Sequence, residues 1–323
     1  MSVTAPRKRQ RTETLSDAQC TVESAERSFI WFDDGNVVLQ AENTLFRVHQ
    51  SLLAFHSEFF SDMFSLPQPQ DDTSQPMFEP GCPQIHLSDS AKDVTYLLST
   101  MFKSMKKYDG EKLMEPEHAV ALYRLGNKYG IEHLREDVLC RMKEEYPSTL
   151  QGWREASPST AFFPRKELLT TMANLAYEYN ILSVLPAIHV DLCQYSTEGL
   201  FDMKDKDLLN PAVLKACLIG KDKLIHALRA ALDVREGAGE YANCLTGTCG
   251  TMFSLLSRDI DARYLSDRGI FCHTGTMLDF YDVECCAECL KFLKGIAEPI
   301  RAELWDNLPS FFGLPTWAEL KAL

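Results

Sequence analysis

The chain has 323 residues, of which 45% are hydrophobic and 24% charged, and its formal net charge is −13. This length accommodates two or three domains, and the composition is that of a globular protein. The negative charge argues against a general nucleic-acid surface, because phosphate binding relies on clustered Lys and Arg. No apolar run approaches the roughly 20 residues that span a bilayer, and residues 1–15 lack the apolar segment of a signal peptide. We therefore expect a protein that stays inside the cell, in the cytoplasm or the nucleus and away from membranes.

Residues 1–27 form a polar tail that we expect to be disordered. Its basic cluster, Arg7–Arg11, has the composition of a short nuclear-import signal, and a solvated tail of no particular function explains the same residues. Both interpretations stay open.

Two strands are predicted next. Asp34-Gly35 is a turn signal, Val37 and Leu39 alternate with polar positions, and the alternation resumes at Phe46 and Val48 after a reversal over residues 41–43. This pattern indicates a β-hairpin with one buried face.

The period then becomes helical. Apolar residues recur at helical spacing at Leu52, Leu53, Phe55, Phe59, Phe60 and Met63. Because Ser57-Glu58 has the character of a helix end followed by a new N-terminus, we expect two short helices.

A loop and two longer helices follow. Leu66–Pro83 is rich in Pro, Gln and Asp without periodicity, which predicts an exposed, mobile loop, and 85–87 has the pattern of a brief strand. Ser88–Ser90 caps a helix whose apolar stripe begins at Val94. Glu115-Pro116-Glu117 starts another helix, with proline in the first turn and carboxylates at the positive end of the dipole. We expect its core face to consist of Ala119, Leu122, Tyr123 and Gly126.

These elements resemble a BTB/POZ domain. His49 stands where the family pattern V-H-x-x-x-L has its histidine, and the other motif positions are filled by Asp34, Phe46, Leu53, Ser57 and Phe60. The resemblance implies an α+β fold, with a small sheet and helical hairpins over residues 28–147 and a mostly α-helical extension behind them. It also implies recruitment of protein partners without chemistry. We expect His49 to be a structural core histidine, since one histidine without a metal-spaced neighbour cannot form a site.

A weak internal repeat extends the helical region. The stretch 125–134 is echoed by 175–184, and Gly130 and Asn180, two residues that tolerate the left-handed conformation, occupy the same place. Each copy predicts a helix, a tight reversal and a second helix, although generic helix-pair chemistry would give the same pattern. We expect Phe162–Tyr195 to be helical, within an extension that covers residues 148–235.

The remainder, residues 236–323, is predicted to be a Cys-containing helical segment. One or two helices over Asp207–Leu232 precede it, and Asp233–Glu240 is a predicted linker. The ending Leu304–Trp317 is dense in aromatics and prolines, so we expect irregular structure packed on the helices before it. From about residue 28 onward the chain resembles the BTB proteins of mushroom-forming fungi, which share the helix start at 87–90 and this ending.

Eleven cysteines are scattered through apolar helical contexts, and most should be reduced thiols. Cys244 and Cys249, with Cys286 and Cys289, have spacings that suit one tetrahedral structural zinc. The alternative, which we favour, is that they are small apolar core residues, because Cys286 and Cys289 share a helical face with aliphatic side chains.

An enzymatic function is not expected. A Cys-dependent hydrolase is the weaker alternative. It would need a nucleophile, a base and an orienting group brought together, and Cys249 is the best nucleophile that the chain offers. Phosphate loops, dinucleotide fingerprints and H-E-x-x-H are absent from the sequence.

Two roles compete within protein interaction. The first is a substrate adaptor that docks on a cullin scaffold and holds a target for ubiquitylation; the second is a transcription-related or architectural oligomeriser. In BTB domains of transcription factors a basic residue follows the motif histidine, but here the residue is Gln50, and no zinc-finger array follows. We favour the adaptor, with a homodimer, protein partners and a cullin as a candidate among them.

Overall fold

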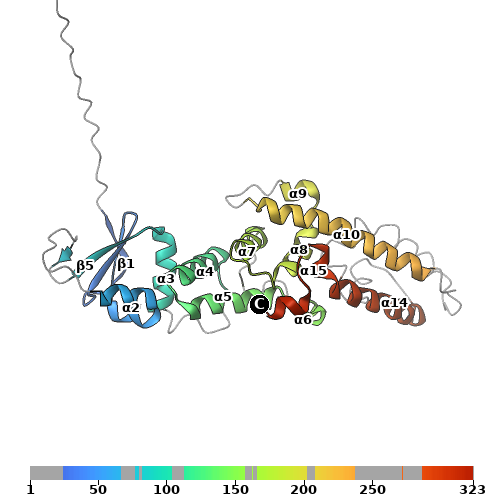
Figure 1. Cartoon of the computed structure of the whole chain (residues 1–323), viewed down its shortest axis with the longest axis horizontal. Coiled ribbons are helices and arrows are strands. Elements are labelled where there is room, and N and C mark those ends of the chain that lie inside the picture. Colours follow the sequence, from blue (N-terminus) through green and yellow to red (C-terminus); the bar gives the residue numbers. More distant parts are fainter. Residues whose placement is uncertain are drawn as a thin grey trace, which may run out of the picture. The chain divides into compact units, whose positions relative to one another are not determined.

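The computed structural model describes residues 25–66, 77–79, 82–103, 113–156, 162, 166–201, 208–236, 271 and 286–322 (Figure 1). They fall into two compact units. The first contains the described residues up to His49 and those from 77 to Ala91, and the second contains the others. Each unit is described by itself.

The first unit is a five-stranded sheet in the order β1-β3-β2-β5-β4. Its strands are β1 (Glu26–Trp31), β2 (Val37–Ala41), β3 (Thr44–Val48), β4 (Met77–Glu79) and β5 (Cys82–Leu87). The β2–β3 pair is the predicted antiparallel hairpin, whereas β1 pairs with β3, and β5 with β2, in parallel. The hairpin prediction is therefore confirmed.

The sheet buries more than the sequence alternation predicts. Besides Val37 and Leu39, the intervening Val38 is fully buried, and it clusters with Leu45 and Cys82 on the other face. The reason is that this face carries its own apolar cluster, against which the partly buried Trp31 also packs, so Val38 is covered as well. The prediction of one loop over Leu66–Pro83 is wrong at 77–79 and at Cys82–Pro83, because these residues form β4 and start β5.

The second unit is helical in its described part. Its elements are α1 (Gln50–His56), α2 (Glu58–Ser65), α3 (Ala91–Lys103), α4 (Pro116–Lys128), α5 (Glu132–Glu145), α6 (Leu150–Glu155), α7 (Lys166–Glu178), α8 (Leu185–Cys193), α9 (Thr197–Phe201), α10 (Pro211–Glu236), α14 (Ala287–Asp306), α15 (Leu308–Phe311) and α16 (Trp317–Ala322). Helix α4 packs against α5 and α7, and α10 packs against α8, α14 and α15. The predicted starts of α3 and α4 are confirmed. The predicted linker Asp233–Glu240 is wrong over residues 233–236, which continue α10, and its other residues lie outside the described part.

The two predicted reversals have the same backbone geometry. Gly130 and Asn180 have φ angles of 63° and 56°, both left-handed. After each of them an isoleucine N–H donates to a carbonyl five residues earlier, from Ile131 to Gly126 and from Ile181 to Ala176, at 2.8 Å in both cases. This is the Schellman arrangement, which satisfies carbonyls that a helix C-terminus leaves open.

The C-terminal helices dock through a tryptophan cluster. The ring of Trp305 stacks on Trp317 with centroids 5.8 Å apart, lies 5.5 Å from Trp153 of α6, and meets Phe271 edge-on at 5.0 Å. Its indole N–H donates to the carbonyl of Ser148, and that of Trp317 donates to the carbonyl of Trp305. The predicted packing of the ending is confirmed. Its predicted irregular form is wrong, because it consists largely of the end of α14, the short helix α15 and the start of α16.

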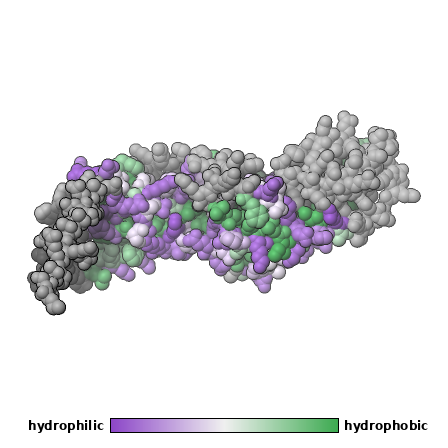
Figure 2. Space-filling model, turned by 90° about the horizontal axis from the view of Figure 1, so that it is seen from above, coloured by the Kyte–Doolittle hydropathy of each residue, from purple (hydrophilic) through white to green (hydrophobic). Residues whose placement is uncertain are grey.

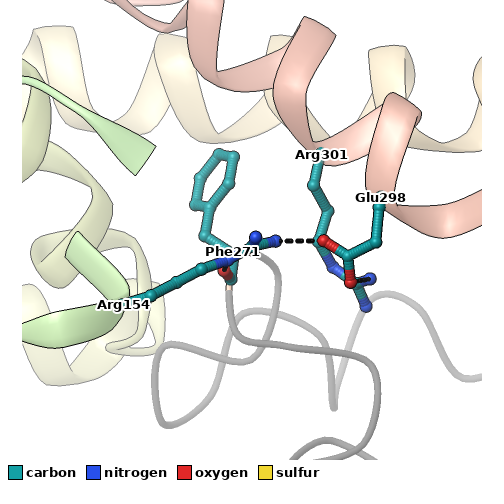
Figure 3. Close-up of polar contacts among 4 residues, drawn as sticks. All are labelled: Arg154, Phe271, Glu298 and Arg301. Carbon is teal, nitrogen blue, oxygen red and sulfur yellow. Dashed lines mark hydrogen bonds and ion pairs between the residues drawn. The ribbon is translucent and has the colours of Figure 1, made fainter. Parts of the chain in front are cut away.

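A buried ionic cluster lies beside these rings (Figure 3). Arg154 of α6 donates to the Phe271 carbonyl at 2.9 Å and to Glu298 of α14 at 2.6 Å, and Arg301 contacts the other oxygen of Glu298 at 3.4 Å. Both arginine side chains are almost fully buried. Because an unpaired buried charge is costly, this pairing fixes where α14 can lie on α6.

Phe312 makes a third contact of the C-terminal end. Its ring stacks on His189 of α8 with centroids 4.6 Å apart. On α10 it covers Gly220, where an added Cβ would lie 2.1 Å from the Phe312 ring, so only glycine permits this approach. His189 is buried with neither ring nitrogen at hydrogen-bonding geometry. Burial lowers its pKa to about 4, against the opposing effect of the Leu185 carbonyl, so the ring is neutral near pH 7.

We expect Gly130→Val to lower the free energy of unfolding by about 1–2 kcal/mol, because a β-branched residue is strained at positive φ. Lack of space contributes nothing, since an added Cβ meets no atom within 4 Å. Gly130→Asn should cost clearly less, because Asn180 adopts the same conformation in the second reversal. Urea unfolding of the full chain measures both variants, and equal losses would contradict the strain argument.

We also expect His189 to make stability depend on pH. With a folded pKa of about 4 and an ordinary value of 6.5, the unfolded chain binds a proton that the folded chain does not between these values. The free energy of unfolding is therefore at its full value above pH 6.5, and His189 lowers it as the pH falls toward 4. His189→Phe should remove roughly 2 kcal/mol of the loss between about pH 7 and about pH 5. Urea unfolding at both values tests this; the exposed His226→Gln is the control, and parallel pH profiles for wild type and His189→Phe would refute it.

Candidate protein-interaction surface

The motif residues of the sequence fall into both units, and most of them are structural. Phe46 is buried in β3, while Leu53, Ser57 and Phe60 are buried in the α1–α2 hairpin. These four side chains hold the fold and are not available to a partner.

His49 departs from the prediction. It was expected in the core, but its side chain is 32% exposed. Its Nε2 lies 3.6 Å from an oxygen of the exposed Asp34, and its ring lies 5.4 Å from that of Phe32. The physical reason is that His49 follows the last residue of β3, where the chain leaves the sheet beside the Asp33–Asp34 turn. Its structural role is therefore at the rim of the sheet.

Ser57 joins two helical hairpins. As the N-cap of α2 its hydroxyl oxygen accepts from the N–H of Phe60 at 3.1 Å, and its O–H donates to the carbonyl of Tyr129 at the end of α4. A cap of this kind stabilises a helix by about 1 kcal/mol. The second bond attaches the start of α2 to the α4–α5 reversal.

Aromatic rings cover the same junction. Phe60 stacks on Tyr129 with centroids 4.9 Å apart, and Phe64 lies 6.1 Å from Phe60. The ammonium of Lys128 lies 5.1 Å from the centre of the Tyr129 ring, within the range of a cation–π contact. The junction is therefore rigid and its backbone is well supported.

Two large apolar side chains stay outside this core. Phe55 is 79% exposed and Phe59 is 48% exposed. Their recurrence at helical spacing with Leu53 and Phe60 predicts helices, but it does not place them on the buried faces of α1 and α2. At about 100° per residue, Phe55 lies about 200° around the helix from Leu53, so the two cannot share a face.

Two histidines lie close to Phe55, whereas the ring of Phe59 lies 5.4 Å from those of Phe60 and Tyr129. The ring of His56 meets that of Phe55 edge-on at 5.0 Å and lies 4.9 Å from His133 at the start of α5. Burial and the nearby His133 lower the pKa of His56, so the neutral form is favoured. We call the set Phe55, His56, Phe59 and His133 the aromatic face. It is an apolar surface with polar ring edges, the composition found at interface cores.

The structure describes only two of the four predicted zinc ligands. Cys244 and Cys249 lie outside the described residues, and Cys249 is also the alternative nucleophile. Cys286 is the N-cap residue of α14 and is partly exposed, whereas Cys289 is buried one turn later. In the described part of the chain, no group of three or more His, Cys, Asp or Glu is arranged for a metal ion. The zinc site stays a prediction.

The lengths and compositions of the helices were compared with those of a membrane span. Of those in the described residues, none combines the length and the apolar composition of a membrane span. Figure 2 shows the surface as an interspersed pattern of hydrophilic and hydrophobic residues in the part it colours.

Comparison with known families gives one match. Residues 33–144 match the model of the BTB/POZ domain, a range that begins just before β2, ends near the end of α5 and lies within the predicted 28–147. A search of curated proteins finds no match to the chain. BTB domains mediate protein binding and dimerisation. The chain is thus a BTB/POZ domain-containing protein, with a small sheet and helices at 33–144 and a helical C-terminal region behind them.

Proposed function

We propose that this protein self-associates through its BTB domain and works as an adaptor that links a cullin scaffold to a target protein. The observation that carries the first part is the aromatic face, in which Phe55 is four-fifths exposed on a rigid helical hairpin. A side chain of this size left in water favours association, and Phe59, four residues later in the chain, is a second exposed phenylalanine.

The magnitudes agree with a dimer. Burying one phenylalanine contributes about 1.5–3 kcal/mol, and aromatic anchors of this kind dominate interface energies. A two-fold dimer uses the same surface on both copies, so each phenylalanine counts twice. A standard interface buries roughly 1,200–2,000 Å² in total. The aromatic face would supply part of this area, and the residues around it would supply the rest.

Exposed apolar side chains outside the BTB match support the adaptor role. Behind the BTB match, large hydrophobic side chains are exposed at Tyr177, Tyr195, Phe201, Leu208 and Ile219. They belong to or border α7 to α10, outside residues 33–144. A chain that exposes apolar side chains both in its BTB domain and in its helical extension offers contacts for two partners, as an adaptor must. On this proposal the protein catalyses no reaction itself.

Two further inferences rest on resemblance. We infer that the protein is of the type found in mushroom-forming fungi, and that it works in the cytoplasm or the nucleus. The transcription-related or architectural role is the competing outcome of the experiments below.

We expect Phe55→Glu to convert the dimer into a monomer. A charge at this position would have to be desolvated in the interface, whereas in the monomer it stays in water. Light scattering of the full chain at tens of micromolar measures the mass. Phe201→Glu, which places the same charge at a side chain 61% exposed in α9, is the matched control and should remain dimeric. A wild-type monomer, or a Phe55→Glu dimer, would sink the self-association proposal.

The adaptor role predicts direct binding to a cullin. Purified full-length protein should bind an immobilised cullin N-terminal region in biolayer interferometry, and Phe201→Glu should bind it equally well. If no cullin binds while the protein remains dimeric, the adaptor role is wrong and the architectural role is favoured. Affinity purification that recovers DNA-bound or histone-modifying proteins in place of a cullin would point the same way.

A further inference from the structure

Two buried cysteines face each other across α8 and α10. The sulfurs of Cys193, the last residue of α8, and of Cys217 are 3.9 Å apart, a thiol–thiol hydrogen-bond distance. Both residues are fully buried, and both are free thiols. They are not assembled with a third His, Cys, Asp or Glu into a metal group among the described residues, so the two sulfurs act as a pair.

The charge of a nearby lysine, Lys221, acts on both thiols. Lys221 lies one turn after Cys217 on α10, and its ammonium donates to the carbonyl of Tyr195, just beyond the end of α8. The hydrogen bond from Cys193 and the charge of Lys221 lower the pKa of Cys217, against the effect of burial. The same hydrogen bond, together with burial, raises the pKa of Cys193. Either sulfur can donate in this hydrogen bond, and we assign Cys217, which lies one turn before Lys221 on the same helix, as the thiol that ionises first.

The pair lies next to the place where the C-terminal end docks. His189, one turn before Cys193 on α8, stacks on the ring of Phe312. Gly220, three residues after Cys217 on α10, is the residue that this ring covers. Anything that fixes α8 to α10 at the two cysteines therefore also fixes the two surfaces between which Phe312 is held.

We propose that Cys193 and Cys217 are a redox modification site, at which a peroxide forms a reversible disulfide that clamps α8 to α10 and holds the docked C-terminal end. The Cys217 thiolate attacks one peroxide oxygen, the O–O bond breaks, and the sulfur becomes a sulfenic acid while the other oxygen leaves as water after taking up a proton. The Cys193 sulfur then attacks the Cys217 sulfur, and the S–O bond breaks. The hydroxyl leaves as a second water with the proton of Cys193. The two thiols lose two electrons, and hydrogen peroxide gains them.

The two sulfurs are close enough to react, at 3.9 Å. A disulfide has an S–S distance of about 2.05 Å, so the sulfurs must approach by roughly 2 Å, within the reach of side-chain rotation when the Cβ atoms are suitably placed. Burial makes the reaction slow, because peroxide reaches the pair when the helices open locally. The bond would close a loop of the chain from α8 to α10 and should stabilise the folded state.

The test uses the full-length wild-type protein, treated with hydrogen peroxide and then with a thiol-blocking reagent. Peptide mass spectrometry should find Cys193 joined to Cys217, with reversal by dithiothreitol, and the oxidised protein should have a higher Tm than the reduced one. The exposed Cys140 serves as an internal measure of peroxide dose. If Cys140 is fully oxidised while Cys193 and Cys217 stay reduced, or if they pair with other cysteines, the proposal is wrong.

Two variants test the order of attack. In Cys193→Ala the sulfenic acid on Cys217 has no resolving thiol, so dimedone should label Cys217. In Cys217→Ala, dimedone should not label Cys193 at the same peroxide dose. Equal labelling of both would overturn the assignment of Cys217 as the nucleophile. Circular dichroism confirms that each variant is folded, and the wild-type cross-link decides the proposal if one is not.

Discussion

The candidate surface depends on the two hydrogen bonds that the hydroxyl of Ser57 makes. One atom caps α2 and also attaches it to the carbonyl of Tyr129, immediately before the left-handed Gly130. A buried hydroxyl is costly unless its hydrogen-bonding capacity is used, and here it both donates and accepts. With α2 fixed against the α4–α5 reversal, Phe60 must stack on Tyr129. The exposure of Phe59, the preceding residue of the helix, follows directly, since it is turned about 100° away.

The C-terminal helices are held by contacts of a different kind. The tryptophan cluster, the Arg154–Glu298 pair and the Phe312 ring each join α14–α16 to helices far back in the chain, the ion pair across 144 residues. Apolar rings supply the attraction, and the buried charges permit only the arrangement in which Arg154 meets both a carboxylate and a carbonyl. The end of the chain thereby covers α6, α8 and α10. A partner can therefore contact only those parts of the helical extension that the C-terminal helices do not cover.

Local signals were enough to predict the hairpin, the proline-led start of α4, the Ser57 boundary and the reversals at Gly130 and Asn180, because each is decided within a few residues. The burial of Val38 was not predictable, since it depends on contacts with residues of other strands. The pairing of Arg154 with Glu298 and of Phe312 with Gly220 depends on tertiary contacts that no spacing encodes. For the candidate surface, the spacing predicted that Phe55 and Phe59 lie on helices but did not predict which faces of those helices are exposed. Counting the angle from Leu53 would have placed Phe55 outside.

The most informative residues of this protein are those that depart from the simplest local pattern. Phe55 is apolar where its helix faces water, Gly220 is a glycine inside a long helix, and His189 is a buried imidazole without hydrogen bonds. Gly220 and His189 are explained by one ring, Phe312, which needs the space of the first and stacks on the second. Phe55 has no such explanation within the described chain, where its ring meets only the edge of His56 among the rings around it. A side chain that the protein's own packing does not use is the one most plainly available to another molecule.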